Sequence, residues 1–428
     1  MEIAVVGGGA TGLVAALRLT QKGYRVTVFE KENQLGGLAS SFKAEGWDWP
    51  VERYFHHYFV SDKALKGLAR ELKLEKKLFY LEPKTSVYLE DQIFRFDNPQ
   101  SLLSFPKLNL IDKLRTGLTT LFLKLNPFWQ PLQDISAAEF IQKTMGKNTF
   151  RLIWQPLLQS KFGAFADQIP ASWFWTRLKK RSFALGYFIG GSETLFGALS
   201  DKIRENGGQI LLGQAVTRIQ KTATGFTLYL QGQPSKLKFD KVIATVPPAD
   251  LVKIAPDLSV ADKKALNSLK GLGSLCLILS LKESFLTEGT YWLNINDRRF
   301  PFVAVVEQTN LVAKKHYQDQ TLLYVGGYYP TTHPFFQQNK TALWQKFLPY
   351  LKEINPVFNF DRNLLRLWLF KDGYTQPVVL LNQSGKPPPI TTSIPGLYWA
   401  CLHHVYPEDR GVNYAILLGE KVTNEAIA

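Results

Sequence analysis

Three glycines and one acid near the start of the chain have the types and spacing of a dinucleotide-binding site. Gly7, Gly9 and Gly12 follow an apolar run, and Glu30 ends a second apolar run about 20 residues later. The first glycine permits a tight turn, the second lets a diphosphate approach the backbone, and the third lets a helix pack closely on a strand. The acid can accept hydrogen bonds from a ribose. The predicted contacts are Gly7, Gly9, Ala10, Thr11, Gly12, Glu30 and Lys31.

A glycine doublet, Gly36-Gly37, follows shortly after the acid. This segment resembles the flavin amine oxidase, protoporphyrinogen oxidase and phytoene desaturase superfamily, whose members use such a doublet as a second phosphate contact. The resemblance implies non-covalent FAD rather than NAD, and it adds Gly36, Gly37 and Leu38 to the predicted site. Members usually place an arginine near the doublet, whereas Gln34 and Leu38 flank it here.

Two later segments extend the resemblance over the whole chain. In the superfamily the backbone of a valine contacts the adenine, and the matching residue here is Val216. Gly411 and Val412 match the start of a final helix whose N–H groups face the N1/O2 edge of the flavin, where a helix N-terminus favours negative charge. Many members have an acid for the ribityl chain where this chain has Cys401, and Asp409 is a nearby substitute.

Two of the six histidines, His56 and His57, lie together in the aromatic run 51–59. Strict alternation along a strand would place them on opposite faces, so that one packs in the core and the other faces an open site. No carboxylate or third histidine accompanies them at ligand spacing, so we predict no metal. A purely structural role is the competing interpretation for either histidine.

Part of this run also resembles UDP-galactopyranose mutases, at Tyr54, His57 and Phe59. Bulkier residues stand here between the tyrosine and the histidine. Residues 157–181 have the spacing of a mutase segment in which an aromatic-glycine pair precedes a helix that ends in arginines. The resemblance implies His57 and Arg181 as catalytic residues, with Arg181 a planar, bidentate donor to a diphosphate. A solvated basic helix end is the competing interpretation for Arg181.

The elements that must position these residues alternate along the chain between two domains. We predict an α/β protein with a Rossmann-like FAD-binding domain of the GR2 type in residues 1–60, 187–250 and 386–428. A discontinuous α+β substrate-binding domain takes residues 61–186 and 251–385. At the start of the second nucleotide-binding block, Ser192 is predicted to cap a helix.

Composition narrows the partners. The 428 residues carry a net charge of +15 and 13% aromatic residues, which favours acidic small molecules or anionic lipid. No nucleic-acid motif is present, and no stretch approaches the about 18 apolar residues that span a bilayer. Only two cysteines, and no recognisable signal peptide, favour a reducing, cytoplasmic location. The sequence carries no signal for an oligomeric state.

Residues 102–129 leave two interpretations open. Their apolar side chains alternate with Lys107, Lys113, Arg115 and Lys124. We expect a helix pair that covers the substrate cavity. The competing interpretation is a peripheral contact with the inner face of a membrane.

These features favour an FAD-dependent oxidoreductase that transfers a hydride from an apolar or amphipathic substrate, with an anionic head as one option, to flavin N5. The alternative is a non-redox flavoenzyme of the mutase type that acts on a nucleotide sugar. A third class, a binding protein without turnover, is disfavoured by the intact glycines and Glu30.

Overall fold

The structure, a computed structural model, describes residues 1–234, 236–383 and 385–428. Its first sheet is fully parallel, as the βα pattern predicts, with strand order β10-β2-β1-β14-β20. All five strands come from the segments 1–60, 187–250 and 386–428. The strands are β1 (Glu2–Val6), β2 (Arg25–Phe29), β10 (Gln209–Leu211), β14 (Lys241–Ala244) and β20 (Leu397–Trp399).

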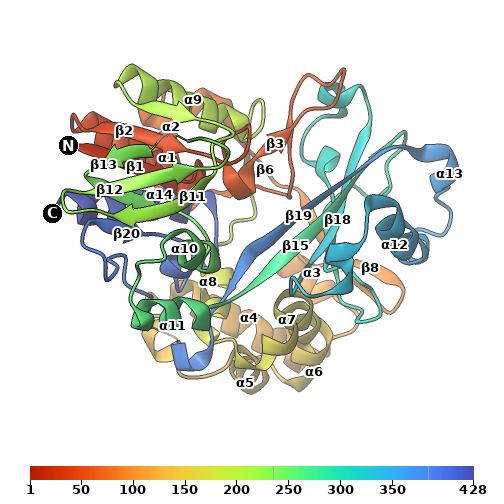
Figure 1. Cartoon of the computed structure of the whole chain (residues 1–428). Helices are drawn as coiled ribbons and strands as arrows, with labels where there is room; N and C mark the ends of the chain where they lie inside the picture. Colours follow the sequence, from red (N-terminus) through yellow and green to blue (C-terminus); the bar gives the residue numbers. More distant parts are fainter. Residues whose placement is uncertain (235, 384) are drawn as a thin grey trace.

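Helices cover one face of this sheet and a small second sheet covers the other (Figure 1). Since side chains alternate along a strand, Ile3 and Val5 face the helices, whereas Ala4 and Val6 face the small sheet. The helices are α1 (Ala10–Gln21), α2 (Lys63–Glu71), α9 (Glu193–Glu205) and α14 (Val412–Ile427). The small sheet has β11 (Val216–Lys221), β12 (Phe226–Leu230) and β13 (Lys236–Phe239). After β14 the chain continues into α10 (Pro248–Ile254) and α11 (Val260–Ser268).

A seven-stranded mixed sheet forms the second domain, in the order β19-β15-β18-β17-β16-β7-β8. Its long strands run diagonally across Figure 1, and α12 (Lys340–Ile354) packs against one face. The strands are β7 (Lys84–Leu89), β8 (Gln92–Arg95), β15 (Lys270–Leu281), β16 (Thr290–Ile295), β17 (Ala304–Glu307), β18 (Thr321–Tyr329) and β19 (Leu364–Val378), which follows the short α13 (Phe360–Asn363).

Helices α3 to α8 form a separate layer below the two sheets in Figure 1, around a core of their own. They are α3 (Pro99–Ser104), α4 (Leu110–Leu125), α5 (Ala137–Thr144), α6 (Lys147–Thr149), α7 (Gln155–Phe162) and α8 (Ala171–Lys180), with a π-helical turn at Phe150–Trp154. Five short strands pack against the face of the mixed sheet that α12 does not cover. They are β3 (Ser41–Phe42), β4 (Val51–Glu52), β5 (Tyr58–Phe59), β6 (Leu78–Leu81) and β9 (Leu185–Phe188).

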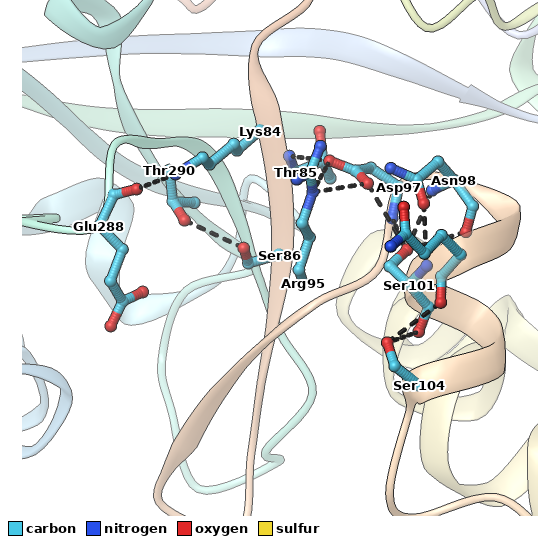
Figure 2. A network of polar contacts seen from close by, with 11 residues as sticks. Lys84, Thr85, Ser86, Arg95, Asp97, Asn98, Ser101, Ser104, Glu288 and Thr290 are labelled. Atoms are coloured by element: carbon cyan, nitrogen blue, oxygen red, sulfur yellow. Dashed lines mark hydrogen bonds and ion pairs between the residues drawn. The ribbon is translucent and has the colours of Figure 1, made fainter.

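A polar network fastens the helical layer to the mixed sheet, as Figure 2 shows. Asp97, just after β8, accepts hydrogen bonds from the Thr85 N–H at 3.2 Å and from Arg95 Nε at 2.9 Å. Asn98 then caps α3: its side chain accepts from the Ser101 N–H at 2.8 Å, and Ser101 Oγ accepts from the Asn98 N–H at 3.0 Å. The direction in which α3 leaves the sheet is therefore fixed by a capping box.

Two local expectations were wrong. Ser192 stands at the N-cap of α9, but its side chain does not cap the helix, because its hydroxyl pairs with that of Tyr58 at 2.8 Å. His56 and His57 lie between the two-residue strands β4 and β5, outside any strand, so strand alternation does not separate them. The predicted fold class, α/β with a Rossmann-like FAD-binding domain, is confirmed.

Candidate functional site

The glycines after β1 are required by close backbone contacts. Gly7 has φ +112°, and a Cβ there would lie 2.5 Å from Thr245 Oγ1. A Cβ on Gly12 would lie 2.0 Å from the Gly7 carbonyl oxygen. At Gly9, in contrast, the nearest atom to an added Cβ is the Gly37 Cα at 3.9 Å. Gly7 and Gly12 thus close the turn onto α1, whereas Gly9 leaves a space that a diphosphate can occupy.

The N-terminus of α1 is open toward this space. Gly9 is its N-cap, so no side chain covers the first N–H groups of Ala10 and Thr11, and the first turn holds no acid. Such a helix end attracts anions, because its N–H groups and its dipole both favour negative charge.

Glu30 lies where the sequence predicted it, beside the loop. It is 7% exposed, and its carboxylate accepts hydrogen bonds from the Gly8 N–H at 2.7 Å and the Glu32 N–H at 2.8 Å. Glu30 therefore holds the glycine loop in place and keeps free lone pairs for a ribose. Lys31 is exposed, and its charge acts on the nearby Asp372 carboxyl, whose pKa it lowers against the effect of burial.

The glycine doublet packs against the first loop. Gly36 and Gly37 have φ +111° and +56°, and Gly9 bridges to Gly36. A Cβ on Gly37 would lie 3.3 Å from the Gly9 Cα. Leu38 follows in a 3-10 turn and is half-buried. The two loops, residues 7–12 and 36–38, thus meet through backbone atoms and form one surface, here called the cradle.

The arginine that the doublet lacks comes from another segment. Arg53 donates its backbone N–H to the Ser40 carbonyl at 3.0 Å, and its guanidinium lies 3.9 Å from the Glu32 carboxylate. Arg53 Nε and Gln34 Nε2 are buried with no hydrogen-bond partner among the described residues. Both orphaned donors fit a phosphate at this edge of the cradle. Sequence reasoning missed Arg53, because nothing in its neighbours marks a return to the doublet.

The last helix packs on α1 and begins at a glycine. Gly411, with φ +144°, is the N-cap of α14, and the first turn from Val412 holds no acid. A Cβ on Gly419 would lie 2.7 Å from the Thr11 carbonyl, so this glycine lets α14 pack directly on α1. Val216 begins β11, close to Gln214, whose N–H donates to the Glu30 carbonyl at 2.8 Å. The structure therefore brings Glu30 and the two glycine loops together, with the segment just before Val216 beside Glu30. The contacts of Val216, Gly411 and Val412 with the cofactor stay predictions.

His57 and Arg181 are also close enough to influence each other. Burial, and then the charge of Arg181, lower the pKa of His57 to about 3. His57 Nδ1 lies 3.3 Å from the Tyr291 hydroxyl, and its ring meets the edge of Trp292 with centroids 5.7 Å apart. A histidine with this pKa is neutral at physiological pH, so His57 can serve as a hydrogen-bond partner but not as a standing cation.

A buried ion pair that the sequence did not reveal lies near Arg177, which also influences His57. Lys161 on α7 is 5% exposed, and its ammonium lies 2.7 Å from the Asp409 carboxylate. Burial lowers the pKa of Lys161 to about 7, although Asp409 opposes this effect. Burial alone would raise the pKa of Asp409, but Lys161 and Arg410 outweigh it and lower that pKa to about 2. Asp409 also accepts from Gln376 Nε2 at 2.6 Å.

Three arginines lie near this pair. None of their guanidiniums has a carboxylate within 4.0 Å among the described residues. Arg177 lies on α8 and Arg181 at its end. Arg410 donates to the Thr375 carbonyl at 3.0 Å and also bonds the Tyr328 hydroxyl. Burial, and then the neighbouring charge of Arg177, lower the pKa of Arg181 to about 9. Uncompensated cations in such a place are suited to an anion.

Asp409 does not have the role that the sequence suggested for it, and two further histidines lie in the turn before α14. The Asp409 carboxylate is held by Lys161 and Gln376, so it is not a free substitute for the ribityl acid. His403 and His404 are buried in a short 3-10 turn before α14, and burial lowers the pKa of each to about 4. His404 Nδ1 accepts from the Cys401 N–H at 3.0 Å, which is a structural role.

A cleft opens beside Asp409 of the ion pair. Its space is about 330 Å³, counted with the open solvent at its mouth. Its walls come from α7, α8, the end of β19 and the loop before α14, and its residues include Phe162, Trp173, Pro377, Tyr406 and Asp409. The cleft therefore has aromatic walls, and its charged lining residues are Glu408 and Asp409.

Known proteins share this architecture. Residues 10–419 match the family described as flavin containing amine oxidoreductase. A solved structure designated a protoporphyrinogen oxidase, from Exiguobacterium sp. 255-15, has a TM-score of 0.75 at 17% identity and covers 99% of this chain and 98% of its own. A reduced UDP-galactopyranose mutase has a TM-score of 0.76 at 14% identity, covering 100% of this chain and 95% of its own. At these identities the likeness shows the fold alone.

Sequence relatives match shorter segments. The carotenoid phi-ring synthase of Streptomyces griseus is 30% identical over 158 residues, which is 33% of this chain and 31% of that protein. The 4,4'-diapophytoene desaturase of Staphylococcus haemolyticus (strain JCSC1435) is 60% identical over 51 residues, 12% of this chain and 10% of that enzyme. The matches thus span less than a third of each relative.

The family agrees with the geometry of this region: two backbone loops, two helices without an acid in the first turn, and buried unpaired donors that fit FAD. The predicted cofactor and the predicted enzyme class are confirmed. Over 10–419, nearly its whole length, this chain belongs to the flavin-containing amine oxidoreductase family and is an FAD-dependent oxidoreductase.

Proposed function

We propose that the substrate is an amphipathic molecule with an anionic end, and that Arg177, Arg181 and Arg410 bind that end. The observation that carries this proposal is the cluster of three guanidiniums around the single Lys161–Asp409 pair. Because that pair is internally neutral, the guanidiniums leave an excess of positive charge in a partly buried place. An anionic group would neutralise it at short range.

Aromatic side chains supply a binding surface for the rest of the molecule. Phe55 and Trp292 meet edge to face with centroids 4.7 Å apart, and His57 lies against the same tryptophan. All three are only half-buried. They would hold an apolar body beside the anionic end and exclude water from it. FAD, when bound, supplies the acceptor for a hydride at N5.

Anaerobic flavin reduction tests this proposal. Donors that share a reacting group but differ in a carboxylate or phosphate are mixed with the enzyme, and loss of flavin absorbance is followed. We expect anionic donors to reduce the flavin, and Arg177→Gln to raise their KM about 10–100-fold with little change in kcat, since one charge-assisted hydrogen bond contributes about 1.5–3 kcal/mol.

The matched control is Arg362→Gln, because Arg362 is exposed and uses only its backbone N–H in the structure. Equal reduction by neutral and anionic donors, or an equal KM for both variants, would refute the anionic end.

We keep a mutase-type reaction as the second candidate, because His57 and Arg181 lie close together, as the mutase resemblance implies. It predicts that a nucleotide sugar binds only when the flavin is reduced, and that Arg181→Lys weakens this binding. The same affinity for oxidised and reduced protein would exclude it.

A further inference from the structure

Helix α4 buries mainly polar side chains and exposes most of its apolar ones. Asp112, Thr116, Thr119 and Leu123 face the protein and are buried, and Leu123 is the one apolar side chain among them. The exposed side is a leucine stripe, Leu110, Leu114, Leu118, Leu121 and Leu125, with Ile111 and Phe122 beside it. These seven side chains, here called the α4 face, are 54% to 71% exposed. A helix on a water-soluble surface normally shows the opposite arrangement.

Specific contacts hold the helix in this orientation. Asp112 Oδ2 accepts from Asn148 Nδ2 at 3.1 Å, and the Thr116 and Thr149 hydroxyls lie 3.3 Å apart. Arg115 Nε donates to the Thr144 carbonyl at 3.0 Å. Turning the leucines inward would break all three contacts, so the fold maintains an apolar surface in water.

The α4 face dominates the exposed apolar surface of the chain. Nineteen large hydrophobic side chains are exposed in the described residues, and nine of them fall within residues 103–128. Leu103 on α3 and Phe128 after α4 extend the surface at its two ends. Monomeric soluble proteins rarely leave such a contiguous patch without a partner.

Positive charge borders the patch. Between residues 99 and 130 the only acid is Asp112, which is buried. Lys107 is neutralised by Glu90 at 2.6 Å. Lys113 and Lys124 donate to backbone carbonyls, and neither has a carboxylate partner in the part of the chain that the structure describes. The charge at this border fits an anionic partner and disfavours a second copy of the same face.

We propose that the α4 face docks on an anionic lipid bilayer, with the leucine stripe at the acyl boundary and Lys113 and Lys124 among the headgroups. Every helix in the described residues is too short or too polar to cross a bilayer, and docking requires none that does. The docked surface adjoins the cationic cluster, because Lys124 Nζ donates to the Arg181 carbonyl at 3.2 Å and Lys179 Nζ to the Lys124 carbonyl at 2.8 Å.

Vesicle flotation of the FAD-loaded protein tests the proposal. We expect the protein to float with phosphatidylcholine–phosphatidylglycerol vesicles, less with phosphatidylcholine alone, and less in high salt. Leu114→Glu with Leu118→Glu should lower the bound fraction at least about tenfold, since each leucine at the acyl boundary contributes apolar burial. The control is Val260→Glu with Val357→Glu, at side chains 84% and 93% exposed elsewhere.

A second variant keeps the test independent of the leucines. Lys113→Glu should weaken binding to the anionic vesicles and leave flavin content unchanged. Failure of the wild-type protein to float with the anionic vesicles would overturn the proposal. A second result would also overturn it. Sedimentation without lipid would show a dimer, the leucine variant would dissociate that dimer, and the protein would not bind vesicles. Neither result bears on the anionic substrate, which is tested by flavin reduction.

Discussion

Two alanine substitutions in the first glycine loop should affect different properties, one FAD binding and the other stability, because the two glycines have different surroundings. At Gly9, φ is −77° and the nearest atom to an added Cβ is 3.9 Å away. Alanine adopts this backbone readily. At Gly12 the added Cβ would lie 2.0 Å from the Gly7 carbonyl oxygen, which is bound into the turn and cannot give way.

We expect Gly9→Ala to keep the stability of the apoprotein within about 0.5 kcal/mol. It should raise the Kd for FAD about 10–100-fold, because the methyl group occupies the space of a diphosphate oxygen and one charge-assisted hydrogen bond contributes about 1.5–3 kcal/mol. Gly12→Ala should lower the free energy of unfolding by about 1–3 kcal/mol or more, since α1 must move off the loop.

The assays are chemical denaturation of the apoproteins and titration with FAD, followed by quenching of flavin fluorescence. Gly197→Ala on α9 is the control, because a Cβ there meets nothing within 4 Å and alanine favours a helix by about 1 kcal/mol. Wild-type FAD affinity in Gly9→Ala, or wild-type stability in Gly12→Ala, would refute the assignment of the loop.

Three other perturbations test the buried charges. Glu30→Gln should lower stability by about 1–3 kcal/mol, because an amide cannot accept from both backbone N–H groups without turning its NH₂ toward one of them; denaturation checks this. Lys161→Met should cost about 3–5 kcal/mol, and adding Asp409→Asn should restore part of the loss; a full cost that persists in the double variant would contradict the pairing. Burial lowers the pKa of His404 to about 4, below its value near 6.5 in the unfolded chain. Between these two values the unfolded chain binds one more proton than the folded protein. The free energy of unfolding should therefore fall as the pH drops from about 6.5 to about 4. His404→Asn keeps an acceptor for the Cys401 N–H. In unfolding measured at several pH values, it should reduce the slope of stability against pH by up to about 1.4 kcal/mol per pH unit. An unchanged slope would show that His404 does not titrate in this way.

Local signals predicted the cofactor cradle, whereas long-range contacts determine the rest of the site. Gly7, Gly12 and Glu30 follow from turn geometry and spacing within one βαβ unit, and the structure places them as expected. Arg53 reaches the doublet from a different segment. Nothing within either segment encodes that meeting, so it could not be predicted from one sequence.

The charged cluster also depends on contacts between distant segments, which one sequence does not reveal. Lys161 and Asp409 are separated by most of the chain, yet their side chains form a 2.7 Å ion pair. The sequence singled out Arg181 by resemblance, but the helix before it and the loop before α14 bring Arg177 and Arg410 to the same place. The roles of His57 and Arg181 in catalysis stay predictions.

The direct packing of α14 on α1 has a consequence for biosynthesis. Gly419 sits against Thr11, and β20 borders β14, so the cradle is completed by segments that begin at Leu397. A nascent chain that has already exposed α1 still lacks this helix and strand until about residue 427 has left the ribosome exit tunnel. The side of α1 that packs on α14 stays uncovered until then, and we expect this stage of synthesis to be the one most prone to aggregation.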